Sequence, residues 1–252
     1  MAKVIALGTS AAVPDEAHAS THLAVEGPHG FFIIDCGDCR PILRFQRAGL
    51  DLDRFLGLLL THFHPDHVSG VPILLMNTWL LGRKRPLPIY GSQDVIDRFN
   101  TMMDLFRRDE WPGFFELPCH LVAEEVGAQV LENEDFVITA APVQHLVPTL
   151  GFRIESKQTG GVLAYSSDTA PCDTVVELAR GADVLIHEAA EPTLGHSSAE
   201  QAGEIARRAG AKRLVLIHYR PASHKYERWL EEATAAFGGP VVLAQDLDAY
   251  EF

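Results

Sequence analysis

The sequence predicts a layered α/β fold, and three observations support this. Short apolar runs typical of buried strands alternate along the chain with segments of helical periodicity. No low-complexity or linker-like stretch interrupts the alternation, which favours one domain over residues 1–252. Several of the apolar runs end in residues able to bind metal, at the strand ends where open α/β sheets place their sites.

Eight apolar runs are predicted as strands. They are rich in Val, Ile, Leu and Phe, and most are bounded by Gly, Pro or Asp, as buried strands are. In chain order they cover residues 3–8, 31–37, 55–62, 87–91, 161–168, 183–189, 213–219 and 240–246. Four of them end in Thr61-His62, Asp168, His187-Glu188 and His218.

Two helices are predicted between these runs. The first follows Ser92 as N-cap, and apolar residues recur at helical spacing from Val95 to Phe106. The second begins with a capping box formed by Ser197 and Glu200 and ends before Gly210.

Composition limits the class of protein. The net charge is −13, opposite to the balance of a protein that grips nucleic acid by its backbone. No run of eighteen apolar residues occurs, and the start MAKVIALGTS has no signal-peptide core, so we expect a soluble, cytoplasmic chain. The four cysteines do not form a disulfide framework.

The motif H-x-H-x-D-H directly follows one apolar run. His62 and His64 are two residues apart in an extended segment, so both project from one face. Pro65 opens a helical turn that carries Asp66 and His67. Imidazole and carboxylate suit Zn²⁺, and also Mn²⁺ or Fe²⁺. Four such groups in six residues suggest two adjacent ions. His62 and His64 would bind one ion, and Asp66 and His67 the other.

Further ligands for two ions are available at the ends of other runs. Asp168 and His218 end apolar strands, and His145 is another candidate. A surface histidine cluster, with Asp66 as a helix cap, is the alternative interpretation. The position of the motif directly after an apolar strand favours the metal site.

The motifs together resemble the metallo-β-lactamase superfamily, and within it the ribonuclease Z-like branch of phosphodiesterases. Beyond H-x-H-x-D-H, similar segments lie in family order at residues 7–14, 35–37, 81–91, 142–154, 165–169, 187–189, 196–202 and 216–220. The resemblance implies an αββα four-layer sandwich with two mixed β-sheets and two zinc ions. It places His62, His64 and His145 on one zinc. It places Asp66, His67 and His218 on the other, and Asp168 bridges the two.

The resemblance also implies a mechanism. Two metals can share a water and lower its pKa for attack on phosphorus, and Asp66 is placed to orient or deprotonate that hydroxide. His196 lies near a predicted helix N-terminus, a favourable place to meet a phosphate. The family pattern has Glu188 orient this histidine, which then assists the transition state or the leaving group. The alternatives are that His196 belongs to a helix cap and that Glu188 is a solvated loop residue.

The substrate is less well defined than the chemistry. Ribonuclease Z carries a long tRNA-binding arm between the segments that match 151–155 and 165–169, whereas here only nine residues separate them. A tRNA 3′-end endonuclease and a small-phosphodiester hydrolase both fit, and a homodimer is a family expectation. A lactonase or thioesterase on the same fold is the alternative, followed by a non-catalytic metal-binding protein.

Two other segments have open roles. Arg83, Lys84 and Arg85 form a basic run that is either a contact for phosphate or RNA or an exposed loop. The apolar segment 93–118 is expected to pack in the core, with a wall of the site or a dimer contact as alternatives.

Overall fold

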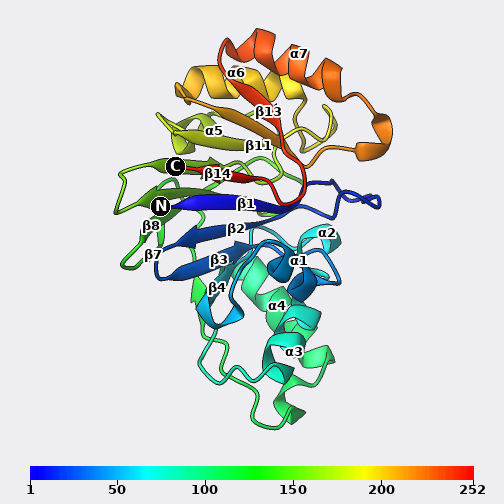
Figure 1. Ribbon diagram of the computed structural model, residues 1–252, viewed down its shortest axis with the longest axis vertical. Helices are drawn as coiled ribbons and strands as arrows, with labels where there is room; N and C mark the ends of the chain where they lie inside the picture. Colours follow the sequence, from blue (N-terminus) through cyan, green and yellow to red (C-terminus); the bar gives the residue numbers. More distant parts are fainter.

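A computed structural model describes residues 1–252 as two seven-stranded sheets packed face to face, with helices on both outer faces (Figure 1). This is the αββα sandwich of two mixed sheets that the resemblance implies. None of the helices is both long enough and apolar enough to cross a membrane.

The first sheet contains the first six strands and the last one. Their bounds are β1 (Lys3–Gly8), β2 (His22–Gly27), β3 (Gly30–Ile34), β4 (Phe55–Leu59), β5 (Ile89–Gly91), β6 (Cys119–Leu121) and β14 (Ala249–Glu251). The order is β14-β1-β2-β3-β4-β5-β6, antiparallel from β14 to β3 and parallel from β3 to β6. The last strand therefore lies beside the first, and both chain ends sit at the same side of the sandwich (Figure 1).

The second sheet repeats this arrangement. Its strands are β7 (Ala128–Glu132), β8 (Phe136–Pro142), β9 (Leu150–Ser156), β10 (Val162–Tyr165), β11 (Val184–Glu188), β12 (Leu214–Ile217) and β13 (Val241–Leu243). The order is β13-β12-β11-β10-β9-β8-β7, antiparallel from β7 to β10 and parallel from β10 to β13. In both halves most of the predicted ligands follow parallel strands, and His145, which follows the antiparallel strand β8, is the exception.

Helices cover the outer faces. Their bounds are α1 (Pro41–Arg47), α2 (Pro65–Val68), α3 (Val71–Leu80), α4 (Gln93–Leu105), α5 (Asp173–Leu178), α6 (Ala199–Ala209) and α7 (Tyr226–Phe237). The helices α1, α3 and α4 share an apolar core with the first sheet, and α5, α6 and α7 share another with the second. A turn of 3₁₀ helix, η3 (Pro221–Ser223), precedes α7.

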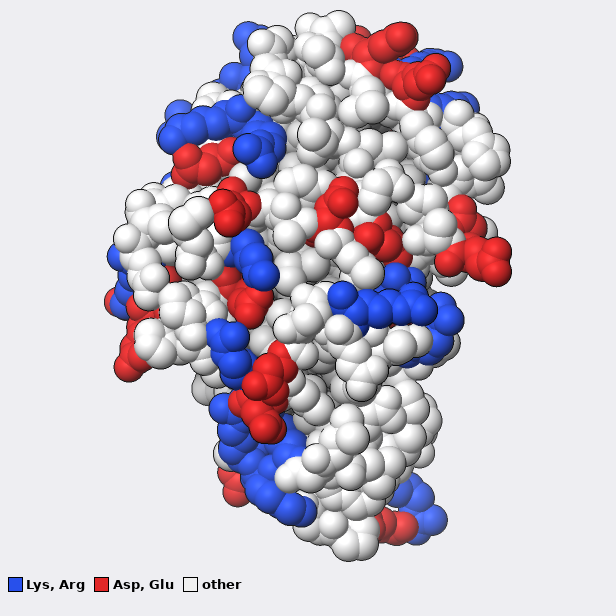
Figure 2. Space-filling model, in the orientation of Figure 1, with Lys and Arg blue, Asp and Glu red and all other residues white.

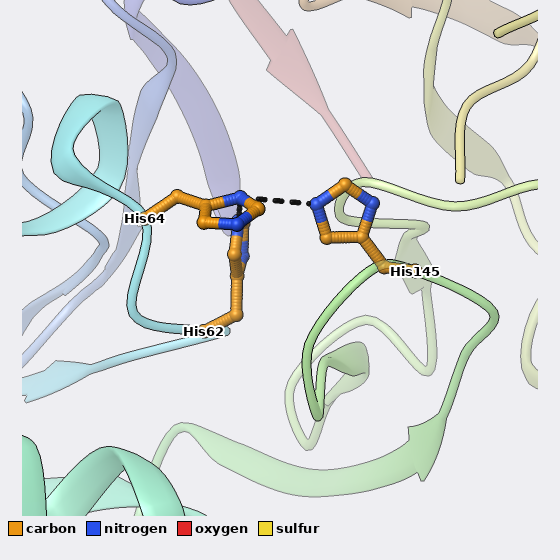
Figure 3. Close-up of side chains that lie close together, drawn as sticks. All are labelled: His62, His64 and His145. Carbon is orange, nitrogen blue, oxygen red and sulfur yellow. Dashed lines mark hydrogen bonds between the residues drawn. The ribbon is translucent and has the colours of Figure 1, made fainter. Parts of the chain in front are cut away.

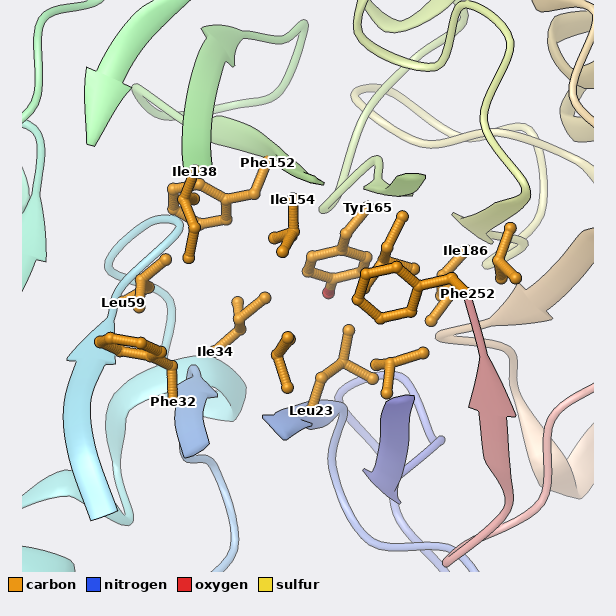
Figure 4. Close-up of a cluster of buried hydrophobic side chains, with 14 of the residues drawn as sticks. Leu23, Phe32, Ile34, Leu59, Ile138, Phe152, Ile154, Tyr165, Ile186 and Phe252 are labelled. Atoms are coloured by element: carbon orange, nitrogen blue, oxygen red, sulfur yellow. The ribbon is translucent and has the colours of Figure 1, made fainter. Parts of the chain in front are cut away.

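Side-chain alternation along β3 explains how one strand serves two cores. Phe31 and Ile33 pack toward the helices, whereas Phe32 and Ile34 belong to the core between the sheets. Figure 4 shows these last two facing Phe152 from the second sheet. Because buried apolar area is the main favourable term in folding, this middle core joins the halves.

All eight predicted strand runs contain a strand, generally shorter than predicted, and α4 begins after Ser92 as expected. The predicted capping box is wrong by one residue. Ser198, not Ser197, is the N-cap of α6, and its partner is Gln201, not Glu200. The reason is that the Ser197 hydroxyl is buried and donates to the Thr169 carbonyl at 2.7 Å.

Candidate metal centre and active site

The H-x-H-x-D-H motif occupies the turn between β4 and α2. β4 ends at Leu59, His62 follows three residues later, His64 is extended, and Pro65 begins the short helix. The turn lies tightly against the loop after β3, where a Cβ at Gly37 would meet the Asp66 carbonyl oxygen at 1.8 Å. Only glycine fits at residue 37, so the segment 35–37 fixes where the motif sits.

Three imidazoles converge at one point (Figure 3). The Nδ1 atom of His64 lies 3.1 Å from Nε2 of His62 and 3.1 Å from Nε2 of His145. Nitrogens bound at tetrahedral angles to Zn²⁺ lie about 3.3–3.4 Å apart, as follows from Zn–N bonds of about 2.0–2.1 Å. The three nitrogens therefore already have nearly the spacing of a metal triad. His145 comes from the loop after β8, so both halves of the molecule contribute.

A second group forms on the other side of Asp168. Potential ligand atoms of Asp66, His67 and His218 lie within 4.8 Å of one another. The Oδ2 atom of Asp168 is 3.4 Å from Nε2 of His67 and 3.2 Å from Nε2 of His218. It is also 3.9 Å from Nε2 of His62, a member of the first triad. Asp168 thus stands between the two groups, as a bridging ligand does.

Unpartnered buried atoms test whether metal fits this centre. Nε2 of His67 and Oδ1 of Asp168 are buried and have no hydrogen-bond partner within the protein. Leaving such groups unpaired costs free energy, about 1–3 kcal/mol for each in typical cases. A cation held by imidazole nitrogens and carboxylate oxygens would satisfy both, so the residues fit a metal.

The other nitrogen of each buried histidine is held by a fixed partner. Nδ1 of His67 lies 2.8 Å from Oδ2 of Asp35, a buried carboxylate that also accepts from the Thr61 hydroxyl at 2.7 Å. Nδ1 of His62 is 2.9 Å from the same hydroxyl, and Nδ1 of His145 is 2.7 Å from the Gly195 carbonyl. Such partners set the tautomer and aim the ring.

His218 has a partner from the opposite half of the molecule. Its Nδ1 lies 3.0 Å from the hydroxyl of Thr21, which in turn donates to the Ser10 carbonyl at 2.9 Å. His218 itself has φ of +53°, a conformation that L residues rarely adopt. Asp35 and Ser167 also have positive φ, at +61° and +55°, and both adjoin predicted metal ligands.

A second acid–base pair lies beside the ligands. Glu188 ends β11, is fully buried, and accepts at Oε1 from Nδ1 of His196 at 2.9 Å. Backbone N–H groups of Thr169 and Ala190 also donate to its carboxylate, each at 2.9 Å. The ring of His196 lies 4.9 Å from that of His145 and remains 19% exposed. Its Nε2 is therefore the atom left for a ligand in the pocket.

Burial and nearby charges shift the pKa values of these side chains in different directions. Burial lowers the pKa of His62 and of His145, which keeps both imidazoles in the neutral form that binds metal. Burial opposes ionisation of Asp168, but nearby His218 and His67 hold its pKa well below the usual range. For His196, burial lowers the pKa, yet the hydrogen bond to Glu188 more than offsets this and raises it.

These groups line one pocket of about 520 Å³. Its polar lining includes His64, Asp66, Asp168, His196 and His218, so four of the predicted metal ligands and the partly exposed histidine face the same space. The rest of the wall is mainly alanine from the first loop, residues 11–12, and from the loops after β11 and β12. This size lies in the range of small-molecule sites.

Comparison with known proteins gives the family. A family model described as a beta-lactamase superfamily domain matches residues 32–219. Over its whole length the chain is 31% identical to a protein named ribonuclease Z from Methanothermobacter thermautotrophicus, of which it covers 97%. The chain belongs to the metallo-β-lactamase superfamily. Within it, the chain falls in the ribonuclease Z-like branch and is a metal-dependent hydrolase.

Solved structures of the metallo-β-lactamase superfamily agree with this assignment. The fold is similar to that of a human short-form tRNase Z, with a TM-score of 0.77 at 26% identity, covering 99% of this chain and 98% of that one. It is also similar to the metallo-β-lactamase fold protein YhfI of Bacillus subtilis, with a TM-score of 0.83 at 22% identity and the same two coverages.

The structure brings all nine predicted site residues of this superfamily member together. The seven predicted ligands form the two groups on either side of Asp168, and Glu188 and His196 contact each other. Sequence reasoning missed the partners Asp35, Thr61 and Thr21. Asp35 carried a signal, because it follows an apolar strand as the ligands do.

The two segments with open roles are structural. The guanidinium groups of Arg83 and Arg85 donate to the Phe55 carbonyl, each at 3.0 Å, and Arg83 also lies over the Phe115 ring. They fasten a loop and do not line the pocket. The apolar face of α4 is buried in the core against the first sheet, as expected.

Proposed function

We propose that this metallo-β-lactamase superfamily member is a dinuclear zinc phosphodiesterase. The observation that carries the proposal is a set of two ligand groups sharing Asp168, with a proton-bearing histidine held beside them in one pocket. A site of this kind has the parts needed to activate water, bind a phosphoryl group and protonate a leaving oxygen.

The donor chemistry fits zinc, and it also suits Mn²⁺ or Fe²⁺. His62, His64 and His145 would hold one ion, the second group another, and Asp168 would bridge them. Every donor is an imidazole nitrogen or a carboxylate oxygen, and the set contains no thiolate. When bound, the two ions would lower the pKa of a water and neutralise charge that develops on the phosphoryl oxygens.

The chain's own residues supply the proton transfers. Asp66 lines the pocket, and its carboxylate is placed to orient the attacking water and accept its proton. His196 is fixed through Nδ1 by Glu188, so its Nε2 carries the proton that the leaving oxygen takes. The raised pKa of His196 keeps that proton available near neutral pH.

The Glu188–His196 pair also separates phosphodiester hydrolysis from thioester hydrolysis. An alkoxide leaving from phosphorus is a strong base and needs a proton, whereas a thiolate leaves without one. A held proton donor therefore supports phosphodiester hydrolysis over thioester hydrolysis. A non-catalytic role is disfavoured because the complete ligand set is present.

For the substrate we propose a phosphodiester, either in RNA or in a small molecule. The curated relatives are named ribonuclease Z, which supports RNA. The connection between β9 and β10 is only residues 157–161, too short for an arm at that position. Figure 2 shows acidic and basic side chains interspersed over the face it displays, rather than one basic surface. These features support a substrate recognised at the pocket itself.

The remaining proposals concern the whole molecule. We propose that residues 1–252 act as one domain, because the core between the sheets draws side chains from both halves. The cytoplasmic location and the homodimer stay predictions.

Hydrolysis of bis(p-nitrophenyl) phosphate by zinc-loaded protein tests the proposed function. We expect turnover that is lost in His62→Ala, because that variant removes a ligand from one ion. No turnover by protein shown to hold two zinc ions would overturn phosphodiester chemistry and direct the search to lactones and thioesters. An equal rate in the variant would place the activity outside this site.

A further inference from the structure

One permanent positive charge lines the pocket. Of the residues around this space, Arg220 is the sole lysine or arginine. His64, Asp66 and His196 face the same space. The guanidinium of Arg220 is therefore the one permanently cationic side chain that this pocket offers to an anionic ligand.

The backbone of Arg220 is held in place. Arg220 lies three residues after the end of β12 and is the N-cap of η3. It adopts the extended conformation that the proline at residue 221 favours, with φ −95° and ψ 98°. Its carbonyl accepts from the backbone N–H of Ser223 at 3.0 Å and from the Ser223 hydroxyl at 2.7 Å. Tyr226 bonds the Pro221 carbonyl at 3.0 Å. The turn thus fixes where the side chain starts.

The guanidinium group itself has no partner in the protein. No carboxylate lies within 4.0 Å of it, and none of the hydrogen bonds in the structure uses its nitrogens. The buried Arg44, by contrast, pairs with Asp38 at 2.9 Å and Asp246 at 2.8 Å, and the exposed Arg228 pairs with Glu232 at 2.7 Å. Arg220 therefore combines a fixed backbone with a free head group.

We propose that Arg220 binds the non-bridging oxygens of the phosphodiester and so makes the pocket select anionic substrates. This rests on the proposed function. Guanidinium presents a planar fork of N–H donors that matches phosphate, and it stays charged at any working pH. A neutral lactone or ester offers no such oxygens. Arg220 and His196 act on the same phosphodiester from one pocket. Arg220 binds its non-bridging oxygens, and His196 donates a proton to its leaving oxygen.

The experiment compares Arg220→Gln and Arg220→Lys with Arg180→Gln in the zinc-loaded enzyme. Arg180 is a matched control, because it is also exposed, has no side-chain partner and does not line the pocket. With bis(p-nitrophenyl) phosphate, Arg220→Gln should lower kcat/KM about 10- to 100-fold, mostly through KM, as expected for a lost charge-assisted bond. Arg220→Lys should recover part of the loss, and Arg180→Gln should match wild type.

A second readout uses inorganic phosphate as the probe. Its inhibition constant, or its binding measured by calorimetry, should weaken in Arg220→Gln by a similar factor, while the zinc content stays at the wild-type value. Turnover and phosphate binding within twofold of wild type in Arg220→Gln would overturn this inference and leave the proposed function standing. A fall confined to kcat, with phosphate binding unchanged, would also overturn it. If wild type itself shows no diester turnover, the proposed function fails, and phosphate binding alone decides the role of Arg220.

Discussion

Replacing Asp35 by asparagine tests whether a buried carboxylate sets the tautomer of His67. Asp35 accepts three hydrogen bonds, from the Thr61 N–H at 2.8 Å, the Thr61 hydroxyl at 2.7 Å and Nδ1 of His67 at 2.8 Å. Asparagine has nearly the same shape but only one oxygen. If that oxygen stays on the Thr61 N–H, the amide NH₂ faces Nδ1 of His67, which must then accept. The imidazole proton moves to Nε2, the atom that points at Asp168.

The magnitude follows from this exchange. Losing a hydrogen bond to a charged group costs about 1.5–3 kcal/mol, and removing the outer partner of a metal-binding histidine typically costs about 10- to 100-fold in metal affinity. We therefore expect the proposed zinc site that contains His67 to lose about 10- to 100-fold in affinity in Asp35→Asn. The metal-free fold should change little, because asparagine tolerates the φ of +61° at this residue.

The assay is zinc titration in a metal buffer, paired with thermal unfolding of the metal-free protein. Asp38→Asn is the matched control, since Asp38 is also buried but pairs with Arg44 and touches no ligand. That variant should lower stability and leave zinc affinity unchanged. Two zinc ions bound by Asp35→Asn as tightly as by wild type would refute the tautomer argument.

Three further predictions concern the proton donor, a glycine and the core. Glu188→Gln removes the partner that raises the pKa of His196, so the alkaline limb of the kcat–pH profile should move to lower pH; an unmoved limb would contradict this assignment. Gly195→Ala and Gly181→Ala both place alanine at positive φ, which should lower the free energy of unfolding by about 1 kcal/mol in each variant. Only Gly195→Ala also places a Cβ 2.9 Å from Nδ1 of His145. Zinc affinity should fall in Gly195→Ala alone, as equilibrium dialysis can show. Phe152→Ala should lower the free energy of unfolding of the metal-free protein by about 3–5 kcal/mol in urea titrations, and a loss under about 1 kcal/mol would mean that the middle core is loosely packed.

Most of the parallel strands were predictable, whereas β6, which is parallel, and several antiparallel strands were not. Parallel strands are buried on both faces, so β4, β10, β11 and β12 read as continuous apolar runs. β6, β7 and β14 include exposed polar residues, and no such run marks them. β8 and β9 were not predicted, although their sequences FVITAAP and LGFRIES are rich in apolar residues and strand-like.

The ligands were predictable because chemistry selects their residue types, whereas their partners were not. An imidazole after an apolar strand is rare enough to stand out in a sequence. Thr21 has no such signal, since any hydroxyl serves and the contact to His218 joins residues 197 positions apart. The shifted capping box has a similar cause, because the Ser197 hydroxyl is used by the distant Thr169 carbonyl.

The division of the predicted ligands between the two halves would tie stability to metal supply. His62, His64, Asp66 and His67 come from the half that holds the first sheet, and the others come from the second. An ion held by both halves binds the folded chain and not the unfolded one, so it adds about 2.7 kcal/mol when free metal is a hundred times Kd. A cell starved of the metal would thus lose folded protein as well as activity, because the unloaded chain opens more often and meets proteases while open.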